Sequence, residues 1–156
     1  MAPSGKTKTV NTPDKSLNDP APIIYHHFDA AFRVWGTDTD IDALTVATKL
    51  NPSESHRRGD KRGNGKWEES MWSFRSTRPE SSDLEDHLDH LLDILEPLKE
   101  RILSAIPANS QPVFWCAHYT NASSGNAGVI TLSPKLFKRL AALGFPLSVD
   151  TYSDCT

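Results

Sequence analysis

The sequence predicts an α+β domain, in which one mixed or antiparallel sheet of about five strands carries about three helices, packed mainly on one face. Two observations predict this class. Apolar residues recur at period two in some segments and at period 3.6 in others, and these segments follow one another as β-α-β-α-β-β-α-β. The chain has 156 residues and no internal repeat, which suits one domain of ordinary size.

The first part of the folded chain contains a strand, a short helix and a loop. Side chains suited to one buried face alternate along residues 23–35, which predicts a strand. Helical spacing of apolar residues predicts a short helix over residues 41–50, which ends because Pro52 forces the preceding residue out of the α conformation. Residues 52–66 have almost no apolar side chains and are predicted to form a loop.

A second strand over residues 67–77 and the clearest helix of the chain follow. Leucines recur at steps of four and three from Leu84 onwards, which is typical of a helix with one buried face. Ser82 and Glu85 have the spacing of a capping box at its start. Pro97 predicts a kink or a break near residues 95–96.

The opposite face of this helix is densely acidic. It carries Glu85, Asp86, Asp89, Asp93 and Glu96. Such a face is usually a solvated surface, and its functional alternative is a docking surface for a basic partner.

The last third of the chain completes the pattern. Residues 113–119 and 127–132 are predicted to be strands, and the turn formers between them predict a hairpin. Ser133 begins a helix that has proline at its first position and ends at Gly144. Residues 145–152 are predicted to form the last strand.

The domain boundaries follow from composition. Residues 1–22 are nearly free of large apolar groups, so we predict a disordered N-terminal tail and a folded domain over residues 23–156. No apolar run approaches the roughly 20 residues that a membrane span needs. The N-terminus does not resemble a secretory signal, and two cysteines do not make a disulfide framework, so we expect a cytoplasmic location away from membranes.

The main candidate interaction site is a basic, glycine-rich segment that leads into the second strand. Cations beside an aromatic ring can bind an acidic partner or a phosphate, and the alternative is a solvated mobile loop. The candidate residues are Arg57, Arg58, Lys61, Arg62, Lys66 and Trp67. The formal charge of −3 for the whole chain argues against nucleic acid as the ligand.

Other reactive side chains fit structural roles better. His87 and His90 each follow an aspartate by four residues on the predicted helix, so surface pairing explains them. Cys116 and His118 share a face of an apolar strand, where a thiolate is disfavoured and where too few ligands are present for structural zinc. We therefore expect no metal, no cofactor and no catalytic residue.

Several motifs occur in a characteristic order. They are Trp35-Gly36, Asn51-Pro52-Ser53, Arg57-Arg58-Gly59-Asp60, Trp67, the helix LEDHLDHLLDILEPL and the ending GVITLSPKLFKRLAALGFPLSVDTY. In this order and spacing they resemble the bacterial family DUF4279, a domain of unknown function, over residues 25–152. The resemblance implies a small α+β domain with no established enzyme activity, and it assigns no catalytic residue. The long N-terminal tail departs from the usual family length.

Two functions are consistent with these features. The first is a non-enzymatic protein-interaction module that acts by occluding a partner, and an immunity-type protein is one form of it by analogy with other small orphan domains. The second is a small-ligand-binding protein or an enzyme, with a pocket near Trp67, Trp72 and Trp115. A concave pocket lined by these rings would favour the second function, and a flat charged face would favour the first.

Overall fold

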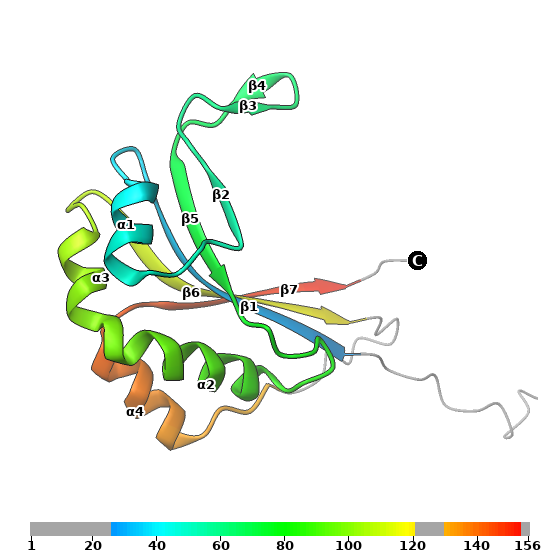
Figure 1. The fold of residues 1–156 in the computed structure, drawn as a ribbon. Helices are drawn as coiled ribbons and strands as arrows, with labels where there is room; N and C mark the ends of the chain where they lie inside the picture. The colour runs from blue at the N-terminus through cyan, green and yellow to red at the C-terminus, as the bar shows by residue number, and fades with distance from the viewer. Residues whose placement is uncertain (1–25, 121–129, 154–156) are drawn as a thin grey trace, which may run out of the picture.

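The computed structural model describes residues 26–120 and 130–153 (Figure 1). The predicted tail over residues 1–22 lies outside these ranges. The described residues form one five-stranded mixed sheet, a small two-stranded sheet and helices, so the predicted α+β class is confirmed. No helix among them is long and apolar enough to cross a membrane.

The main sheet has the strand order β2-β5-β1-β6-β7. Its strands are β2 (Glu54–His56), β5 (Ser70–Arg75), β1 (His26–Gly36), β6 (Gln111–Thr120) and β7 (Leu147–Ser153). Neighbouring strands are antiparallel except β6 and β7, which are parallel because the chain returns between them through a helix. The two-stranded sheet, β3 (Lys61–Arg62) and β4 (Gly65–Lys66), projects from the main sheet as a hairpin that we call the arm (Figure 1).

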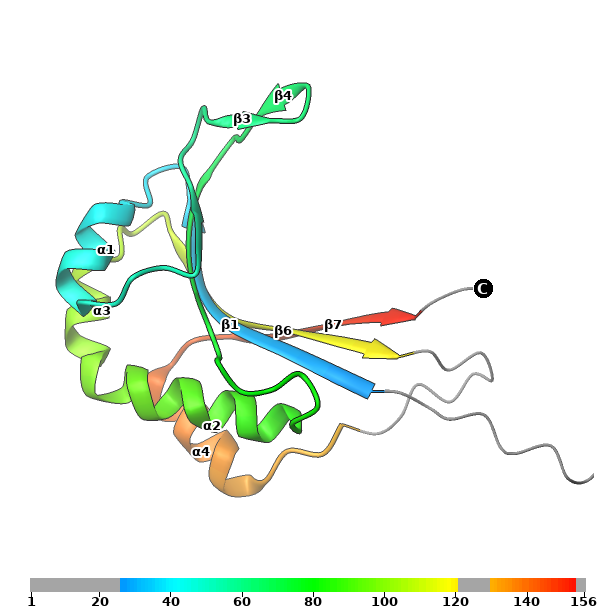
Figure 2. The ribbon, with the colours of Figure 1, turned by 45° about the vertical axis from the view of Figure 1, so that its right-hand side comes forward.

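All the helices lie on one face of the main sheet, as predicted (Figure 2). They are α1 (Ile41–Thr48), α2 (Leu84–Leu95), the 3-10 turn η1 (Glu96–Leu98), α3 (Lys99–Ala105) and α4 (Pro134–Leu143). The break predicted near Pro97 is present, because α2 ends at Leu95 and the proline lies in the 3-10 turn. Fully buried side chains from strands and helices close the core, among them Phe32, Trp72, Phe114, Leu88 and Leu91.

Four of the five carboxylates on the acidic face of α2 contact α4 or the residue before it, and the fifth, Asp86, is exposed. Arg139 of α4 binds Asp89, Asp93 and Glu96 through its guanidinium, at 2.6, 2.7 and 2.9 Å. Glu85 accepts hydrogen bonds from the backbone N–H and the hydroxyl of Ser133, at 2.7 and 2.6 Å, instead of capping its own helix. These carboxylates therefore fasten α4 and its first turn to α2.

The prediction of a hairpin between β6 and a strand over residues 127–132 is wrong for the part of that segment that the structure describes. Residues 130–132 are not in a strand, and residues 127–129 lie outside the described ranges. Both edges of β6 are already occupied, by β1 and β7, so no hairpin partner fits beside it. Ile130 and Leu132 instead pack against the core from an extended connection, which explains their apolar character.

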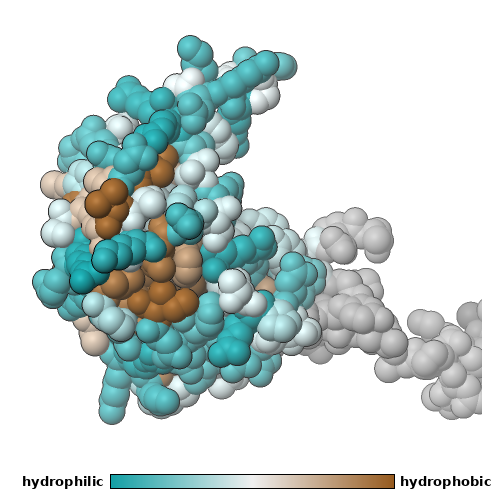
Figure 3. All heavy atoms as spheres, viewed as in Figure 1, coloured by the Kyte–Doolittle hydropathy of each residue, from teal (hydrophilic) through white to brown (hydrophobic). Residues whose placement is uncertain are grey.

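The segment predicted as a loop, residues 52–66, supplies the fifth strand and the arm. β2 has three residues at the edge of the sheet and pairs with β5 through its backbone, so it needs no apolar pattern. In the arm, Arg62 pairs with Gly65 across a two-residue turn in which Gly63 has a φ of +53°. Figure 3 shows that the arm is hydrophilic, whereas hydrophobic residues gather at the surface between α1 and α2.

Candidate functional site

The face of the sheet opposite the helices is uncovered by any described element and is concave (Figure 2). Since side chains alternate along a strand, residues next to those of the core point to this face. The register of the strands brings together a set dominated by charged and aromatic groups: Asp29, Arg33, Trp35, Glu54, His56, Arg75, Trp115, Tyr119, Asp150 and Tyr152. This open face is the candidate functional site.

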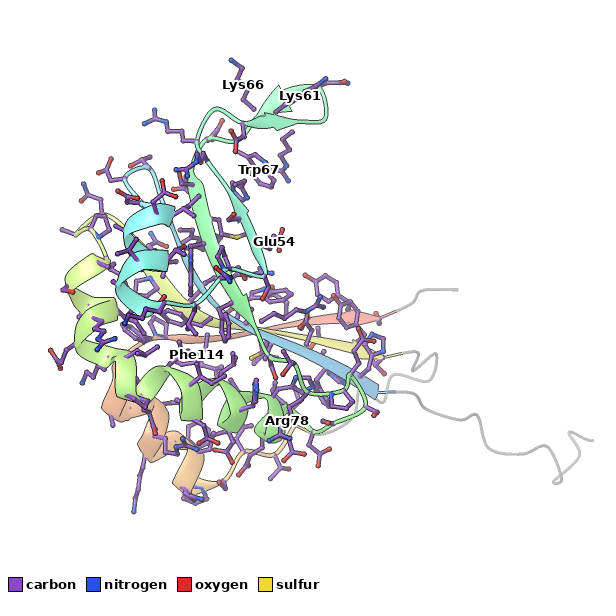
Figure 4. The ribbon with its side chains drawn as sticks, viewed as in Figure 1. Glu54, Lys61, Lys66, Trp67, Arg78 and Phe114 are labelled. Atoms are coloured by element: carbon purple, nitrogen blue, oxygen red, sulfur yellow. The ribbon has the colours of Figure 1, made fainter. Side chains whose placement is uncertain are left out.

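Two adjoining hollows lie along the open face, and together we call them the groove. The larger has a volume of about 1100 Å³ and lies between the arm and strands β1, β2 and β5. The smaller, of about 410 Å³, lies over Asp29, Arg75 and Tyr119. Arg33 and Glu54 line both hollows, so the two hollows adjoin at these side chains. Figure 4 shows Glu54 and Trp67 on the concave side, and Phe114 between the sheet and α2.

The arm is held against the sheet by stacking on Trp67. The ring of His56, on β2, lies 3.7 Å from the Trp67 ring and almost parallel to it. The Arg62 guanidinium lies 4.1 Å from the centroid of the same indole. Hydrogen bonds from Gly59 N–H to the Trp67 carbonyl and from Trp67 N–H to the Asp60 carbonyl close the base of the arm, at 2.8 and 2.9 Å.

The structure brings together four of the six residues predicted for this site. Arg58, Arg62, Lys66 and Trp67 line the groove. Arg57 instead forms an ion pair with Asp42 of α1, at 2.9 Å, and it is not part of the groove lining. Lys61 lies on the arm and does not line the groove either (Figure 4).

Sequence reasoning missed Arg33, which lies where the two hollows meet. Its guanidinium carbon is 3.6 Å from the centroid of the Trp115 ring. Its side chain makes no hydrogen bond or ion pair to a described residue, and its Nε is buried without an acceptor. Burial lowers the pKa of Arg33, and the charges of Glu54 and Asp29 oppose that shift. The signal in the sequence was an arginine inside an apolar strand, at an outward position of the period-two pattern.

At the far end of the groove, the polar groups and aromatic rings have partners within the chain. Arg75 binds the largely buried Asp29 with two hydrogen bonds, and that bonding raises the pKa of Arg75. The Trp115 indole N–H donates to Asp150 at 2.8 Å. Tyr119 stacks on both His27 and Tyr152, and burial raises the pKa of Tyr119.

The three tryptophans named from the sequence do not share a pocket. Trp72 is completely buried on the helix side, where its indole N–H donates to Thr45 of α1 at 3.2 Å. Trp67 and Trp115 both lie on the groove side, but they line different hollows. A pocket made by all three rings is therefore excluded by the direction of Trp72.

The candidate nucleophile Cys116 and the histidines His87 and His118 lie outside the groove. Cys116 is completely buried on the helix side, and burial raises the pKa of its thiol to about 12, so the thiolate is not accessible near neutral pH. His118 and His87 are also buried in the core. Over residues 26–120 and 130–153, no three or more His, Cys, Asp or Glu side chains are arranged to hold a metal ion.

Comparisons with known proteins agree with the resemblance seen in the sequence. A family model described as "Domain of unknown function (DUF4279)" matches residues 25–154. No curated protein and no solved structure matches the chain significantly. The matched residues span nearly all of the folded chain, and the chain therefore belongs to the DUF4279 family.

Proposed function

We propose that this chain is a non-enzymatic binding domain that holds a segment of another protein in the groove of its open face. The observation that carries this proposal is the uncovered concave face with its two adjoining hollows. A mostly antiparallel sheet often leaves one polar face in water, but this face is concave and carries exposed aromatic rings among its charges. The arm would form one wall around the bound segment.

The chemistry of the groove supports a protein ligand. Arginine and tryptophan side chains are the usual carriers of binding energy at protein interfaces, and the groove presents Arg33, Arg58, Arg62, Trp35 and Trp67. Trp35 is 43% exposed, which is a large apolar surface left to water. The larger hollow, of about 1100 Å³, also exceeds the pockets of about 300–1000 Å³ that enclose small ligands, and polar and apolar groups share its lining about equally.

An immunity-type protein would act in this way, by covering the working surface of a toxin. A toxin gene beside the gene of this chain would identify such a partner. The second candidate function, small-ligand binding, is favoured by the smaller hollow of about 410 Å³ alone. Native mass spectrometry of the freshly purified protein would reveal a bound small molecule as added mass.

Site-specific photocrosslinking in the source cells tests the proposal. A benzophenone amino acid placed at Trp35 lies in the groove, and one placed at Phe137, which is 53% exposed on α4, provides a matched aromatic control on the helix side. We expect a discrete protein adduct from position 35 that is absent from position 137. Equal adducts from both positions, or none from position 35, would overturn the proposal.

The crosslinked protein is then purified and its affinity for the chain is measured. Arg58→Ala with Arg62→Ala removes two groove cations, and we expect at least about tenfold weaker binding, as for an interface hot spot. Arg57→Ala is the matched control because Arg57 pairs with Asp42 away from the groove. An unchanged affinity in the double variant would show that the partner binds elsewhere.

A further inference from the structure

We propose that Arg33 is the anchor of the groove and that it binds the side-chain carboxylate of an Asp or Glu residue in the middle of the bound segment. This inference rests on the proposed function and names the chemistry of the ligand. It is carried by an unpaired, half-buried guanidinium at the junction of the two hollows.

Arg33 differs from the other arginines of this region. Arg75 is bound to Asp29, and Arg57 is bound to Asp42. Arg58 and Arg62 form no ion pair with a described residue either, but both are exposed to solvent. The side chain of Arg33 makes no hydrogen bond or ion pair to a described residue, although it is half-buried. A cation withdrawn from water without a partner is destabilising, so a ligand that supplies an anion there gains a strong interaction.

The geometry around Arg33 suits a planar anion. Stacking on Trp115 at 3.6 Å fixes the plane of the guanidinium, and the hydrogen bond from Trp115 to Asp150 fixes the indole in turn. Only Nε is sealed from solvent, so the terminal nitrogens remain open to the groove. Two parallel N–H donors in a fixed plane match the two oxygens of a carboxylate.

Neighbouring charges favour a carboxylate over a phosphate. Glu54, Asp29 and Arg75 are close enough to interact electrostatically with Arg33. Arg75 is paired with Asp29 and offsets its charge, so Glu54 is the unbalanced anion of the three. Glu54 repels a doubly charged phosphate more than a singly charged carboxylate. A hollow also lies on each side of Arg33, so a bound segment has space to extend in both directions from this point. These facts point to an internal acidic side chain and not to a chain terminus.

Nuclear magnetic resonance with small probes tests the subsite without the partner. The Nε–Hε signal of Arg33 and the indole signal of Trp115 are followed during titration with N-acetyl-glutamate α-methylamide, whose only charge is the side-chain carboxylate. N-acetyl-glutamine α-methylamide is the neutral control, inorganic phosphate is the dianion, and sodium chloride matches the ionic strength. We expect saturable shifts with the glutamate probe, and binding at least about tenfold weaker for the glutamine probe and weaker for phosphate.

A variant pair completes the test. Arg33→Gln should abolish the shift of the Trp115 signal, whereas Arg101→Gln, on the exposed side of α3, should leave it unchanged. Equal shifts with the glutamate and glutamine probes in the wild-type protein would overturn the proposal even if Arg33→Gln failed to fold. Tighter binding of phosphate would overturn the choice of carboxylate. The two proposals can fail separately. If position 35 gives a protein crosslink but Arg33→Gln leaves the affinity for that protein unchanged, the Arg33 subsite is rejected and the proposed function is kept.

Discussion

The rings of His56 and Trp67 lie nearly parallel, with 3.7 Å between their centroids, and this contact joins the arm to the edge strand of the sheet. His56 belongs to β2, and Trp67 follows the arm in the chain. The basic segment therefore forms a hairpin with defined contacts to the sheet, and its side chains are exposed to solvent. Its position depends on a few exposed contacts, so it can be tested separately from the core.

Replacing Trp67 by leucine should release the arm without unfolding the domain. An aromatic pair and an exposed cation–π contact are each worth about 0.5–1.5 kcal/mol, so local opening should increase roughly tenfold. The backbone N–H groups of Gly59 and of residue 67 close the base of the arm, so their hydrogen exchange measures this opening. Lys61→Ala should leave the exchange unchanged. Equal protection in the Trp67→Leu variant would mean that backbone pairing alone holds the arm.

Gly36 should tolerate no side chain. Its φ is +151°, and an added Cβ would lie 2.9 Å from the Asn109 carbonyl and 3.0 Å from the Ser110 Cα. We expect Gly36→Ala to destabilise the domain by about 1–3 kcal/mol in urea unfolding. Gly65→Ala is the matched control, because its Cβ would approach nothing closer than 3.8 Å. Similar unfolding midpoints for the two variants would contradict this account.

Arg139 should contribute measurably to the packing of α4 on α2. It binds three carboxylates, and Arg139→Gln would leave Asp89, Asp93 and Glu96 without their shared cation. Because these groups are partly exposed, we expect a loss of about 1–2 kcal/mol, which high salt should reduce. Lys138→Gln, which changes an exposed neighbour on the same helix, should have little effect. Chemical denaturation at low and high salt measures both variants.

His87 should make the stability depend on pH. Its ring is 1% exposed, neither nitrogen makes a hydrogen bond of good geometry, and burial lowers its pKa from 6.5. The backbone of Pro79 and the charges of Asp29 and Asp86 oppose the shift, and His90 adds to it. Since the unfolded chain binds the proton more tightly, the stabilisation is complete above about pH 6.5 and is lost as the pH falls toward the lower folded pKa.

His87→Leu should therefore flatten the stability curve between pH 7 and pH 5, two values that bracket the ordinary histidine pKa of about 6.5. Urea unfolding at several pH values measures the slope. At pH 8 the His87 side chain of the wild-type protein is neutral. A difference in the free energy of unfolding at that pH therefore reports the change in packing and not the protonation of His87. A slope identical to that of the wild-type protein would assign the pH dependence to other groups.

Much of the fold could be predicted from local pattern. The leucine spacing of α2, the break at Pro97 and the helix between Ser133 and Gly144 follow from side-chain periodicity and from the missing N–H of proline. The buried side of β1 was also predicted, because its alternation is strong. Four of the six candidate site residues line the groove. They could be named from the sequence because a segment rich in basic and aromatic residues is recognisable without knowledge of its place in the fold.

Tertiary structure alone decided the rest. β2 is paired through its backbone and carries no apolar signature, whereas the apolar residues of 130–132 pack without pairing, so periodicity assigned the fifth strand to the wrong segment. Alternation separates the two faces of a strand but does not say which face the helices cover, because that depends on residues distant in the sequence. Arg33 became a candidate site only when the fold placed it on the uncovered face, over Trp115 and without a partner in the described chain.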